Sequence, residues 1–413
     1  MTASHPRRVV LLASSRSYRN QAFLDAAGRL GVEVVTGADV PLPLLHKTDA
    51  GLPLDYRDIV KSAEAVVAYA REHPVGAILG VDDSGTLLAA RAGEALGLPG
   101  NAPEAAQAAR HKHAMRCRFA EAGVPSPRFR LFHVGDDPER VAREVSFPCV
   151  VKPTTLSGSR GVMRADTPGE LASRFRRLER ILAVERCDEI LVEDYVPGVE
   201  VALEGLLDGG RLHVLALFDK PDPLEGPFFE ETIYVTPSRL SEDAQERIRD
   251  AASRAAAALG LREGPVHAEL RLNDAGPWLV EVAGRSIGGL CSRTLRFGVS
   301  ASLEELILRQ ALGLGFETAP RDRSAAGALM VPIPRAGILR GVEGIDVARA
   351  VPLIEDVEIT ARLNYPLVPL PEGDSYLGFV FARGEAPQAV ESALRRAHAC
   401  LRFDIATDLA LRP

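Results

Sequence analysis

Short apolar runs alternate with amphipathic stretches through the first hundred residues. Runs typical of buried strands lie at residues 9–12, 32–35 and 77–81. Helical spacing is found between them at residues 20–30 and 59–71, and an alanine-rich helix is predicted to end at Gly97. Strands separated by helices predict a parallel sheet covered by helices. The first strand is followed by Ala13-Ser14-Ser15-Arg16-Ser17 and not by GxGxxG, so a dinucleotide site is not supported.

The pattern changes after residue 105. One helix is predicted over residues 105–121, followed by Gly123 and an extended Val124-Pro125-Ser126-Pro127. Short strands then dominate, at residues 147–153, 190–193, 200–207 and 213–218. A helix over residues 243–259 is predicted to have Ser241 as its N-cap. Strand-like segments resume from about residue 325, and a last helix covers about residues 387–400.

Composition narrows the class of protein. The 413 residues carry a formal charge of −7, which argues against a nucleic-acid coat because neutralising phosphates needs a basic surface. Hydrophobic residues make up 46% and charged residues 25%, as in globular proteins. No apolar run approaches the ~20 residues of a membrane span, and the run at residues 9–13 is too short for a signal peptide. The five cysteines form no CxxC pair, so we expect reduced thiols, a cytoplasmic protein and no structural zinc.

Lysine is scarce in this chain. Only five of the 49 basic residues are lysines, so the other 44 are arginines. The five are Lys47, Lys61, Lys112, Lys152 and Lys220. A compact ammonium on a flexible stem is not interchangeable with a planar guanidinium. The positions at which lysine is kept are therefore worth locating first.

Two strand-like runs, residues 266–272 and 278–283, flank a turn. If this hairpin is symmetric about Ala275, Glu269 lies opposite Glu281. Strand alternation puts His267 and Ala283 on the same face, and the core face then holds Ala268, Leu270, Leu272, Val280 and Val282. Opposed carboxylates are unfavourable unless a cation lies between them, and such hard oxygen ligands suit Mg²⁺ with a nucleotide's phosphates. The alternative is the exposed polar face of an edge hairpin.

A strand lysine precedes a loop of small residues. Lys152 ends the strand Phe147-Pro148-Cys149-Val150-Val151-Lys152-Pro153, and the loop contains Ser157-Gly158-Ser159-Arg160-Gly161. Small residues let backbone N–H groups approach phosphate oxygens, while the lysine supplies a fixed charge. The order differs from GxxxxGK[ST], in which the lysine follows the glycines. A plain hairpin connection is the alternative for this segment taken alone.

A third stretch, residues 193–200, has the form E-x-Y-V-x-G-x-E. With it, the order of motifs resembles that of the ATP-grasp superfamily over about residues 100–300. The series begins with Lys112 ahead of the GVP.P exit, continues with the Lys152 strand and its loop and with residues 193–200, and ends at the paired-glutamate hairpin. The resemblance implies two antiparallel sheets that clamp ATP between them.

The resemblance also implies roles for individual residues. Lys112 and Lys152 would contact ATP phosphates, as would the loop of Ser157, Gly158 and Ser159. Adenine would meet Glu193 and the backbone of Asp194 and Val196, and ribose would meet Glu200. Mg²⁺ or Mn²⁺ would be held by Glu269 and Glu281. Lys220 falls where a third basic residue often approaches the γ-phosphate.

Within the superfamily the chain most resembles the L-amino acid ligases, the bacilysin-type dipeptide synthetases. Glu281-Val282-Ala283-Gly284-Arg285 has alanine where many ATP-grasp enzymes have a further asparagine ligand, and residues 375–380 resemble the group's closing subdomain. In the substrate-side segment, residues 226–234, Glu231 fits the glutamate that faces the amino acid, whereas Tyr234 replaces a histidine.

Two further positions concern the substrate pocket. Arg285 would bind the substrate carboxylate or the acyl-phosphate transition state, where a bidentate guanidinium is most effective. Gly289 stands where relatives have a tryptophan that narrows the pocket, so we expect a roomier pocket. His267 is a candidate substrate contact or a structural histidine, and Asp82-Asp83-Ser84 either lines the substrate crevice or caps a helix.

The implied fold class is α/β and α+β, an ATP-grasp fold. We expect an N-terminal parallel α/β domain at residues 1–105, an ATP-grasp domain at 106–320 with a lid at about 125–195, and a C-terminal subdomain at 321–413. The implied function is an ATP-dependent ligase that joins small-molecule carboxylate and amine substrates through an acyl phosphate. Arg285, Glu231 and Lys220 would serve the chemistry. No nucleic-acid or membrane partner is expected, and a homodimer is a candidate assembly.

Two alternatives stay open at this point. One is a bicarbonate-activating carboxylase of the purine or biotin type, although no carboxyl-carrier domain follows here and the stretch from Glu281 to Arg285 fits that group less well. The other is a non-catalytic nucleotide-binding module, which the retained glutamates and mapped lysines disfavour. The sequence leaves the identity of both substrates open.

Overall fold

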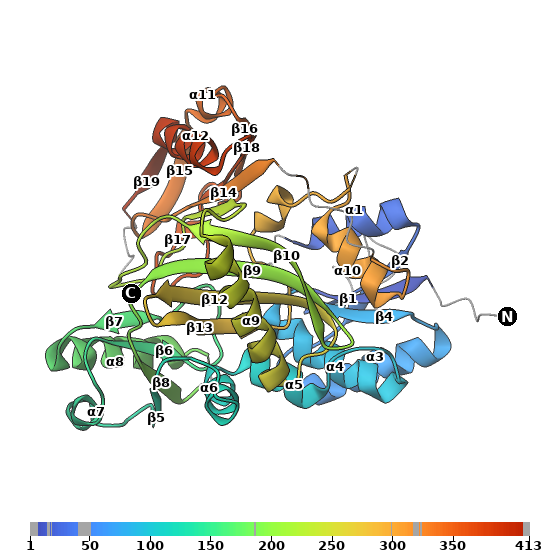
Figure 1. Ribbon diagram of the computed structural model, residues 1–413, viewed down its shortest axis with the longest axis horizontal. Coiled ribbons are helices and arrows are strands. Elements are labelled where there is room, and N and C mark those ends of the chain that lie inside the picture. Colours follow the sequence, from blue (N-terminus) through green and yellow to red (C-terminus); the bar gives the residue numbers. More distant parts are fainter. Residues whose placement is uncertain are drawn as a thin grey trace.

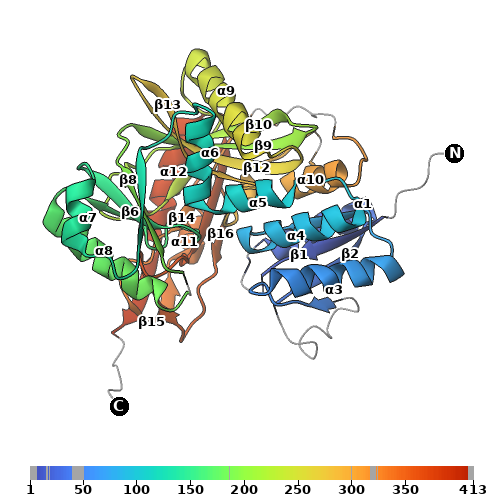
Figure 2. The ribbon, with the colours of Figure 1, turned by 90° about the horizontal axis from the view of Figure 1, so that it is seen from below.

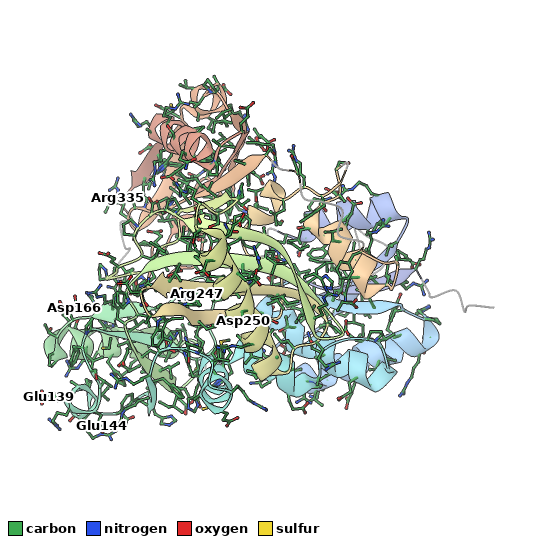
Figure 3. All side chains as sticks on the ribbon, in the orientation of Figure 1. Glu139, Glu144, Asp166, Arg247, Asp250 and Arg335 are labelled. Atoms are coloured by element: carbon green, nitrogen blue, oxygen red, sulfur yellow. The ribbon has the colours of Figure 1, made fainter. Side chains whose placement is uncertain are left out.

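The computed structural model describes residues 7–14, 17, 19–39, 51–185, 187–298, 300–316, 322 and 324–407. Lys47 lies outside these ranges. Figure 1 shows a central sheet with an N-terminal domain on one side, a small lid below it and the C-terminal segment above it. Charged side chains such as Arg247 and Asp250 on the front helix cover the outside (Figure 3). No helix among the described residues has the length and apolarity to cross a bilayer.

The N-terminal domain is the predicted parallel sheet covered by helices. Its strands lie in the order β3-β2-β1-β4: β1 Arg8–Leu12, β2 Glu33–Ala38, β3 Gly51–Pro53 and β4 Ala77–Gly80. Its helices are α1 Asn20–Leu30, α3 Ile59–Glu72 and α4 Asp83–Leu96. Alternate residues of β1 enter two cores, because Val9 and Leu11 pack with α1 whereas Val10 and Leu12 pack with α3 and α4.

An eight-stranded sheet forms the centre of the molecule, in the order β13-β12-β9-β10-β11-β14-β18-β16. Its strands are β9 Val199–Asp208, β10 Arg211–Lys220, β11 Ile233–Thr236, β12 Gly264–Asn273, β13 Gly276–Ala283, β14 Ala325–Val331, β16 Ile354–Ile359 and β18 Gly378–Gly384. It is covered in part by α9 Glu242–Leu259, α10 Leu303–Ala311 and α12 Pro387–Cys400. Strands from the predicted C-terminal subdomain therefore continue the same sheet.

A smaller antiparallel sheet forms the lid. Its order is β5-β8-β6-β7, with β5 Phe129–His133, β6 Cys149–Pro153, β7 Met163–Ala165 and β8 Glu189–Asp194. Two helices, α7 Pro138–Glu144 and α8 Pro168–Leu182, cover it. Figure 2 shows the lid and the N-terminal domain on opposite sides of the molecule. The C-terminal segment adds α11 Ile345–Arg349 and a third sheet of β15 Gly337–Glu343, β17 Pro366–Leu367 and β19 Arg402–Ala406.

The single helix predicted over residues 105–121 is wrong. The chain forms α5, Pro103–Arg110, and α6, Lys112–Glu121, with extended backbone at His111 between them (φ −108°, ψ 106°). Two contacts favour the break: the His111 imidazole caps α6 by accepting from the Ala114 N–H, and the Lys112 N–H donates to the Thr154 carbonyl at 2.8 Å. Lys112 is thereby held at the start of α6, beside the lid loop.

The hairpin of β12 and β13 pairs Glu269 with Glu281, as predicted, but by a different route. Asn273 pairs with Gly276, so the turn has two residues and is not centred on Ala275. A bulge between Glu269 and Leu270 of the ladder restores the pairing, because one extra residue on β13 is left unmatched. The prediction that Val280 faces the core is therefore wrong: Leu279 is fully buried there, and Val280 is half-buried.

The turn between β4 and α4 is unusually close. A Cβ at Gly80 would lie 2.7 Å from the Gly85 carbonyl carbon and the Thr86 nitrogen, and one at Gly85 would lie 3.0 Å from the Leu12 carbonyl oxygen. The helix can therefore begin directly behind its strand only because both residues are glycines. Asp83, the first residue of α4, consequently lies at the carboxyl edge of the parallel sheet.

Replacement of Gly80 by alanine should destabilise the protein by about 1–3 kcal/mol, because α4 must move off the sheet. Gly93 is the matched control, since it lies in the same helix and a Cβ there would meet nothing within 4 Å. Gly93→Ala should be neutral or stabilising by about 0.5–1 kcal/mol. Urea unfolding followed by circular dichroism measures both changes, and equal stabilities of the two variants would contradict this packing argument.

Candidate active site

The predicted site residues converge between the lid and the central sheet. Their side chains come from the start of α6, from lid strands β6 and β8, and from strands β9, β10, β12 and β13, which Figure 1 shows facing the lid. On β9 and β12 the alternation of side chains puts every second residue on this face. The row is formed by Glu200, Glu204, His267, Glu269 and Arg271.

Lys220, at the end of β10, lies inside a cage of three carboxylates. Its Nζ is 2.8 Å from Glu200 and 2.9 Å from Glu269, and it also donates to Glu231. One oxygen of each glutamate lies within 4.8 Å of the others. Burial lowers the pKa of Lys220, but the three carboxylates outweigh it and hold the pKa well above its usual value. The cage thus brings together residues predicted to bind ribose, metal and amino acid.

The predicted metal ligands are Glu269, a member of this cage, and Glu281, which is paired with it across the β12–β13 ladder. Burial raises the pKa of Glu269, but Lys220 and then His267 outweigh that effect and hold the pKa well below its usual value. Glu281, opposite it, has its carboxylate 3.3 Å from the Lys112 Nζ. Both groups are half-buried oxygen donors opposed across one strand pair, which is a donor set that suits Mg²⁺ or Mn²⁺.

His267 contacts two glutamates, one through each ring nitrogen. Its Nδ1 is 3.1 Å from Glu204, which is fully buried and also accepts from the Ile287 N–H at 3.0 Å, and its Nε2 is 3.6 Å from Glu269. Burial lowers the pKa of His267, but hydrogen bonds to the two glutamates raise it to about 9. The charged imidazole therefore supports Glu269 in this structure, and its predicted substrate contact stays a prediction.

Lid residues hold the second cluster. The Lys152 Nζ is 2.6 Å from Glu193, whose other oxygen is 2.7 Å from the Arg116 Nε. Glu193 and Lys152 are each at most 5% exposed, and Arg116 is fully buried. Arg116 was not singled out from the sequence, although it lies four residues after Lys112 and hence on the same face of α6. It also donates to the Val280 carbonyl at 2.6 Å and so joins the lid to β13.

The segment between the lid and β9 is fixed by Arg271. This side chain pairs with Glu200 at 2.9 Å, donates to the Val196 carbonyl at 2.8 Å and lies 5.0 Å from the Tyr195 ring centre. Asp194, the neighbouring residue, pairs with Arg128 at 2.6 Å. The sequence analysis did not single out Arg271 either. Its position two residues after Glu269, on the same strand face, was the available signal.

The small-residue loop contacts the C-terminal segment. Gly158 and Ser159 have positive φ angles of 64° and 55°, and the Gly161 N–H donates to the Pro371 carbonyl at 2.8 Å. Behind the loop, Arg177 of α8 makes two hydrogen bonds to the Glu372 carboxylate, of 2.6 and 2.9 Å. The loop predicted to bind phosphates is therefore held against residues 371–374.

The substrate-side residues lie beside the cage. The Tyr234 hydroxyl is 3.5 Å from Glu269, and the Lys220 Nζ is 5.0 Å from the Tyr234 ring centre. A side chain at Gly289 would project toward Phe379, with its Cβ 3.0 Å from that ring. Phe379, from the C-terminal segment, therefore fills the space in that direction. The glycine does not leave this side of the pocket open, although a roomier pocket was expected from the sequence.

Arg285 follows β13 and points to the N-terminal domain. Its Nε and Nη2 are each 3.0 Å from the same oxygen of Asp83, and its Nη1 donates to the Ser286 carbonyl at 3.0 Å. The Asp82 side chain makes no hydrogen bond to the N-terminus of α4, whereas Asp83 faces Arg285. The structure thus favours the crevice interpretation of these aspartates over helix capping.

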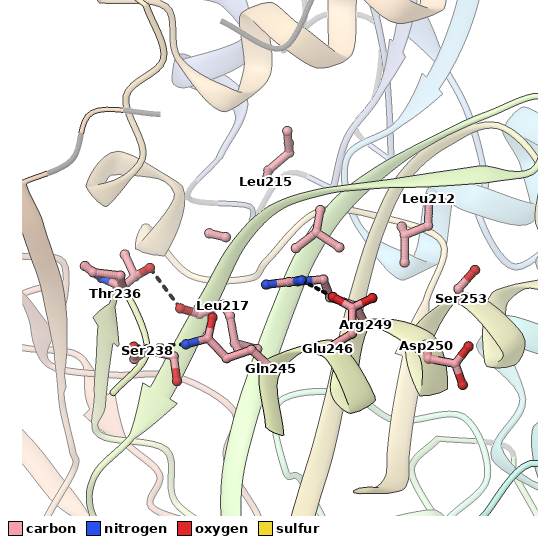
Figure 4. A pocket seen from close by; sticks show the side chains of 13 residues that line it. Leu212, Leu215, Leu217, Thr236, Ser238, Gln245, Glu246, Arg249, Asp250 and Ser253 are labelled. Carbon is pink, nitrogen blue, oxygen red and sulfur yellow. Dashed lines mark hydrogen bonds and ion pairs between the residues drawn. The ribbon is translucent and has the colours of Figure 1, made fainter. Parts of the chain in front are cut away.

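One hollow of about 700 Å³ lies elsewhere, between β10 and α9 on the outer side of the sheet (Figure 4). Its polar side chains are largely paired with each other or with backbone, as Glu246 is with Arg249 and as Thr236 is with the Leu217 carbonyl. None of the predicted site residues lines it. The hollow is therefore separate from the cluster described above.

Comparison with known families gives three matches along the chain. Residues 24–100 match the model of the ATP-grasp N-terminal domain, and residues 145–294 match that of the ATP-grasp domain. Residues 329–406 match the model described as L-amino acid ligase C-terminal domain 2. The three matches follow one another in the order of the predicted domains.

Individual relatives agree with these matches. Alanine–anticapsin ligase of Bacillus subtilis is 31% identical over 219 residues, which is 48% of this chain and 46% of that relative, so the alignment spans about half of each. The crystal structure of an L-amino acid ligase from Bacillus licheniformis is 26% identical with a TM-score of 0.81, covering 96% of this chain and 99% of that one. A carboxyaminoimidazole ribonucleotide synthase from Aspergillus clavatus shares the fold, with a TM-score of 0.74 and 14% identity over 95% and 98% of the two chains.

Burial lowers the pKa of Lys152 to about 8, with Glu193 opposing the shift. If this ammonium contacts ATP, the affinity for ATP should fall as the pH rises from 7 to 9, because the ammonium loses its proton over that range. Lys152→Arg should abolish the pH dependence, since a guanidinium stays charged. Calorimetric titration with ATP measures both, and Lys61→Arg, at a lysine whose side chain is 83% exposed, is the control. An ATP affinity independent of pH in the wild type would contradict this role.

The contact between the small-residue loop and residues 371–374 should assist nucleotide binding. Glu372→Gln removes the charge that pairs with Arg177 and should weaken ATP binding about fivefold, as expected for a partly exposed pair worth about 1 kcal/mol. The exchanged pair Arg177→Glu with Glu372→Arg should recover most of the affinity. Unchanged ATP affinity in the single variant would show that the C-terminal segment does not support the loop.

Proposed function

Because the chain belongs to the ATP-grasp superfamily of ATP-dependent ligases and is L-amino acid ligase-like, we propose that it is an ADP-forming carboxylate–amine ligase. It joins two amino acids, or an amino acid and another small acid, through an amide or peptide bond. The observation that carries the proposal is the carboxylate cage around Lys220. There Glu231, the candidate residue for binding the amino acid, forms an ion pair with Lys220. The same ammonium also pairs with Glu269, the candidate metal ligand.

The reaction has two steps. A substrate carboxylate oxygen attacks the γ-phosphorus of ATP, the bond to the β-phosphate oxygen breaks, and ADP and an acyl phosphate form. A neutral amine then attacks the acyl carbon, inorganic phosphate leaves and the amine loses a proton. The protein mainly positions the reactants and neutralises charge in such reactions.

Phosphate charge is met by the lysines. Lys112 begins α6 beside the lid loop and Lys152 lies on β6, so both lie near the loop of Ser157, Gly158 and Ser159. Asp194, Val196 and Glu200 follow along the segment that would hold the nucleoside. Glu269 and Glu281 would hold Mg²⁺ or Mn²⁺, which supplies positive charge to the phosphates when bound.

The reacting groups are met by residues of the cage and by Arg285. Glu231 would hold the ammonium of an amino-acid substrate, and Tyr234 and His267 contact Glu269 of the same cage. Lys220 would turn from the carboxylates to the γ-phosphate once another cation takes its place among them. Arg285 would stabilise the acyl-phosphate oxygens, because its planar guanidinium matches two oxygens at once.

The C-terminal match distinguishes this proposal from a bicarbonate-activating enzyme. The likeness to the purine-type synthase shows the fold alone, since identity is 14%. By contrast, the model of the L-amino acid ligase C-terminal domain covers residues 329–406, and these residues supply Phe379 beside Gly289 and the segment that contacts the lid loop. The carboxylate–amine ligase is therefore the function that we carry forward.

The test is product formation from ATP, Mg²⁺ and a library of amino acids, read by mass spectrometry and by phosphate release. We expect amide products and stoichiometric ADP, with bicarbonate in place of the amino acids giving no release. Glu281→Ala should lose at least about 100-fold of the activity, because a metal ligand is removed. Phosphate release that depends on bicarbonate and not on amino acids would contradict the proposal, and so would no release with either.

A further inference from the structure

An ion pair crosses from the N-terminal domain into the candidate active site. Asp83, the first residue of α4, and Arg285, two residues after β13, are 202 positions apart in the chain. The Asp83 Oδ2 is 3.0 Å from both the Nε and the Nη2 of Arg285. The two side chains are only 21% and 13% exposed. A buried ion pair is favourable only in a well-defined geometry. A surface pair is less demanding and usually contributes little to stability.

The surroundings keep both members of the pair in place. Asp83 is fixed by the close turn at Gly80 and Gly85, which lets α4 begin at the edge of the sheet. On the other side, Arg19 at the start of α1 donates to the Val81 carbonyl at 2.6 Å and to the Ser286 carbonyl at 3.2 Å. The N-terminal domain therefore holds the segment that follows β13 at two points, through side chains from two different helix starts.

A second carboxylate, that of Glu281, also attracts Arg285. Burial lowers the pKa of Arg285, but the charges of Asp83 and then of Glu281 outweigh it and raise the pKa. Glu281 is the predicted metal ligand, so a guanidinium that turned toward it would compete with the metal. Asp83 holds the Arg285 side chain on the N-terminal side. Among the described residues, the contacts to Asp83 and Ser286 engage three of the five guanidinium N–H groups, which leaves two donors for a ligand.

We propose that Asp83 is a positioning residue for Arg285, so that the N-terminal domain contributes directly to the active site. This rests on the proposed function, in which Arg285 stabilises the acyl phosphate. In that function Arg285 stabilises the charge on the acyl-phosphate oxygens when the acyl phosphate forms and again when phosphate leaves. Loss of Asp83 should therefore slow both steps of the reaction, while the binding of ATP and of the amine is kept.

The experiment removes the need for the amine substrate by using hydroxylamine, a small neutral nucleophile that traps the acyl phosphate as a hydroxamate. For Asp83→Asn we expect kcat to fall by about 10- to 100-fold in both hydroxamate and amide formation, as for a displaced catalytic group. KM for ATP and for the amine should be unchanged. In an Arg285→Lys background the same change should have little further effect, because the two residues act as a unit.

Arg29→Gln is the matched control. Arg29 of α1 pairs with Glu305 of α10 at 2.8 Å and so also joins the N-terminal domain to the helix that packs on it, but on the surface. This variant should keep wild-type kcat. Thermal unfolding and ATP binding of both variants show that each is folded, and Asp83→Glu, which keeps the charge, should retain more activity than Asp83→Asn.

The outcomes are distinct. A raised KM for the amine with hydroxamate formation intact would mean that Asp83 binds the amine, and it would overturn the positioning role. Wild-type kinetics in Asp83→Asn, or an equal loss in Arg29→Gln, would overturn it as well. A wild-type enzyme that forms neither hydroxamate nor amide would refute the proposed function itself, and the role of Asp83 would fall with it.

Discussion

The site depends on one constraint, which is that a buried charge must be paired. Lys152, Lys220 and Arg285 are each largely buried, and each is held by carboxylates: Glu193, the cage around Lys220 and Asp83. Unpaired, any of these cations would cost several kcal/mol of desolvation, and so would the carboxylates. The protein therefore keeps its cations and anions within contact distance. In the proposed function, the binding of a nucleotide and a metal would be an exchange of partners among groups that are already in place.

Backbone irregularities put these charges within reach. The break between α5 and α6 at His111 places Lys112 against the lid loop, and the bulge in β13 turns Glu281 toward Glu269. The two glycines of the β4–α4 turn bring Asp83 to the sheet edge. Each irregularity interrupts a regular element at a residue with a proposed role in the site, and functional sites are where local rules are commonly broken. Side chains from the N-terminal domain, from the start of α6 beside the lid and from the central sheet are consequently brought together.

Much of this arrangement was predictable from the sequence, and the rest was not, for physical reasons. Periodicity predicts the N-terminal sheet and the hairpin, since strand and helix spacing report local burial. The pairing of Glu269 with Glu281 came out right because the shorter turn and the bulge offset each other. The break at His111 was unpredictable, because an alanine-rich segment favours continuous helix, and one of the two contacts that oppose it comes from the distant Thr154 carbonyl. Arg116 was hidden among 44 arginines.

We expect a metal–nucleotide complex to take over the carboxylates that are now paired with lysines. Diffraction from crystals grown with ADP and Mn²⁺ tests it directly, because manganese is located by its anomalous scattering. We expect an anomalous peak between Glu269 and Glu281, with the ion pairs of Lys112 to Glu281 and of Lys220 to Glu269 broken. A peak inside the cage of Glu200 and Glu231 with both ion pairs intact, or nucleotide bound without any metal peak, would contradict it.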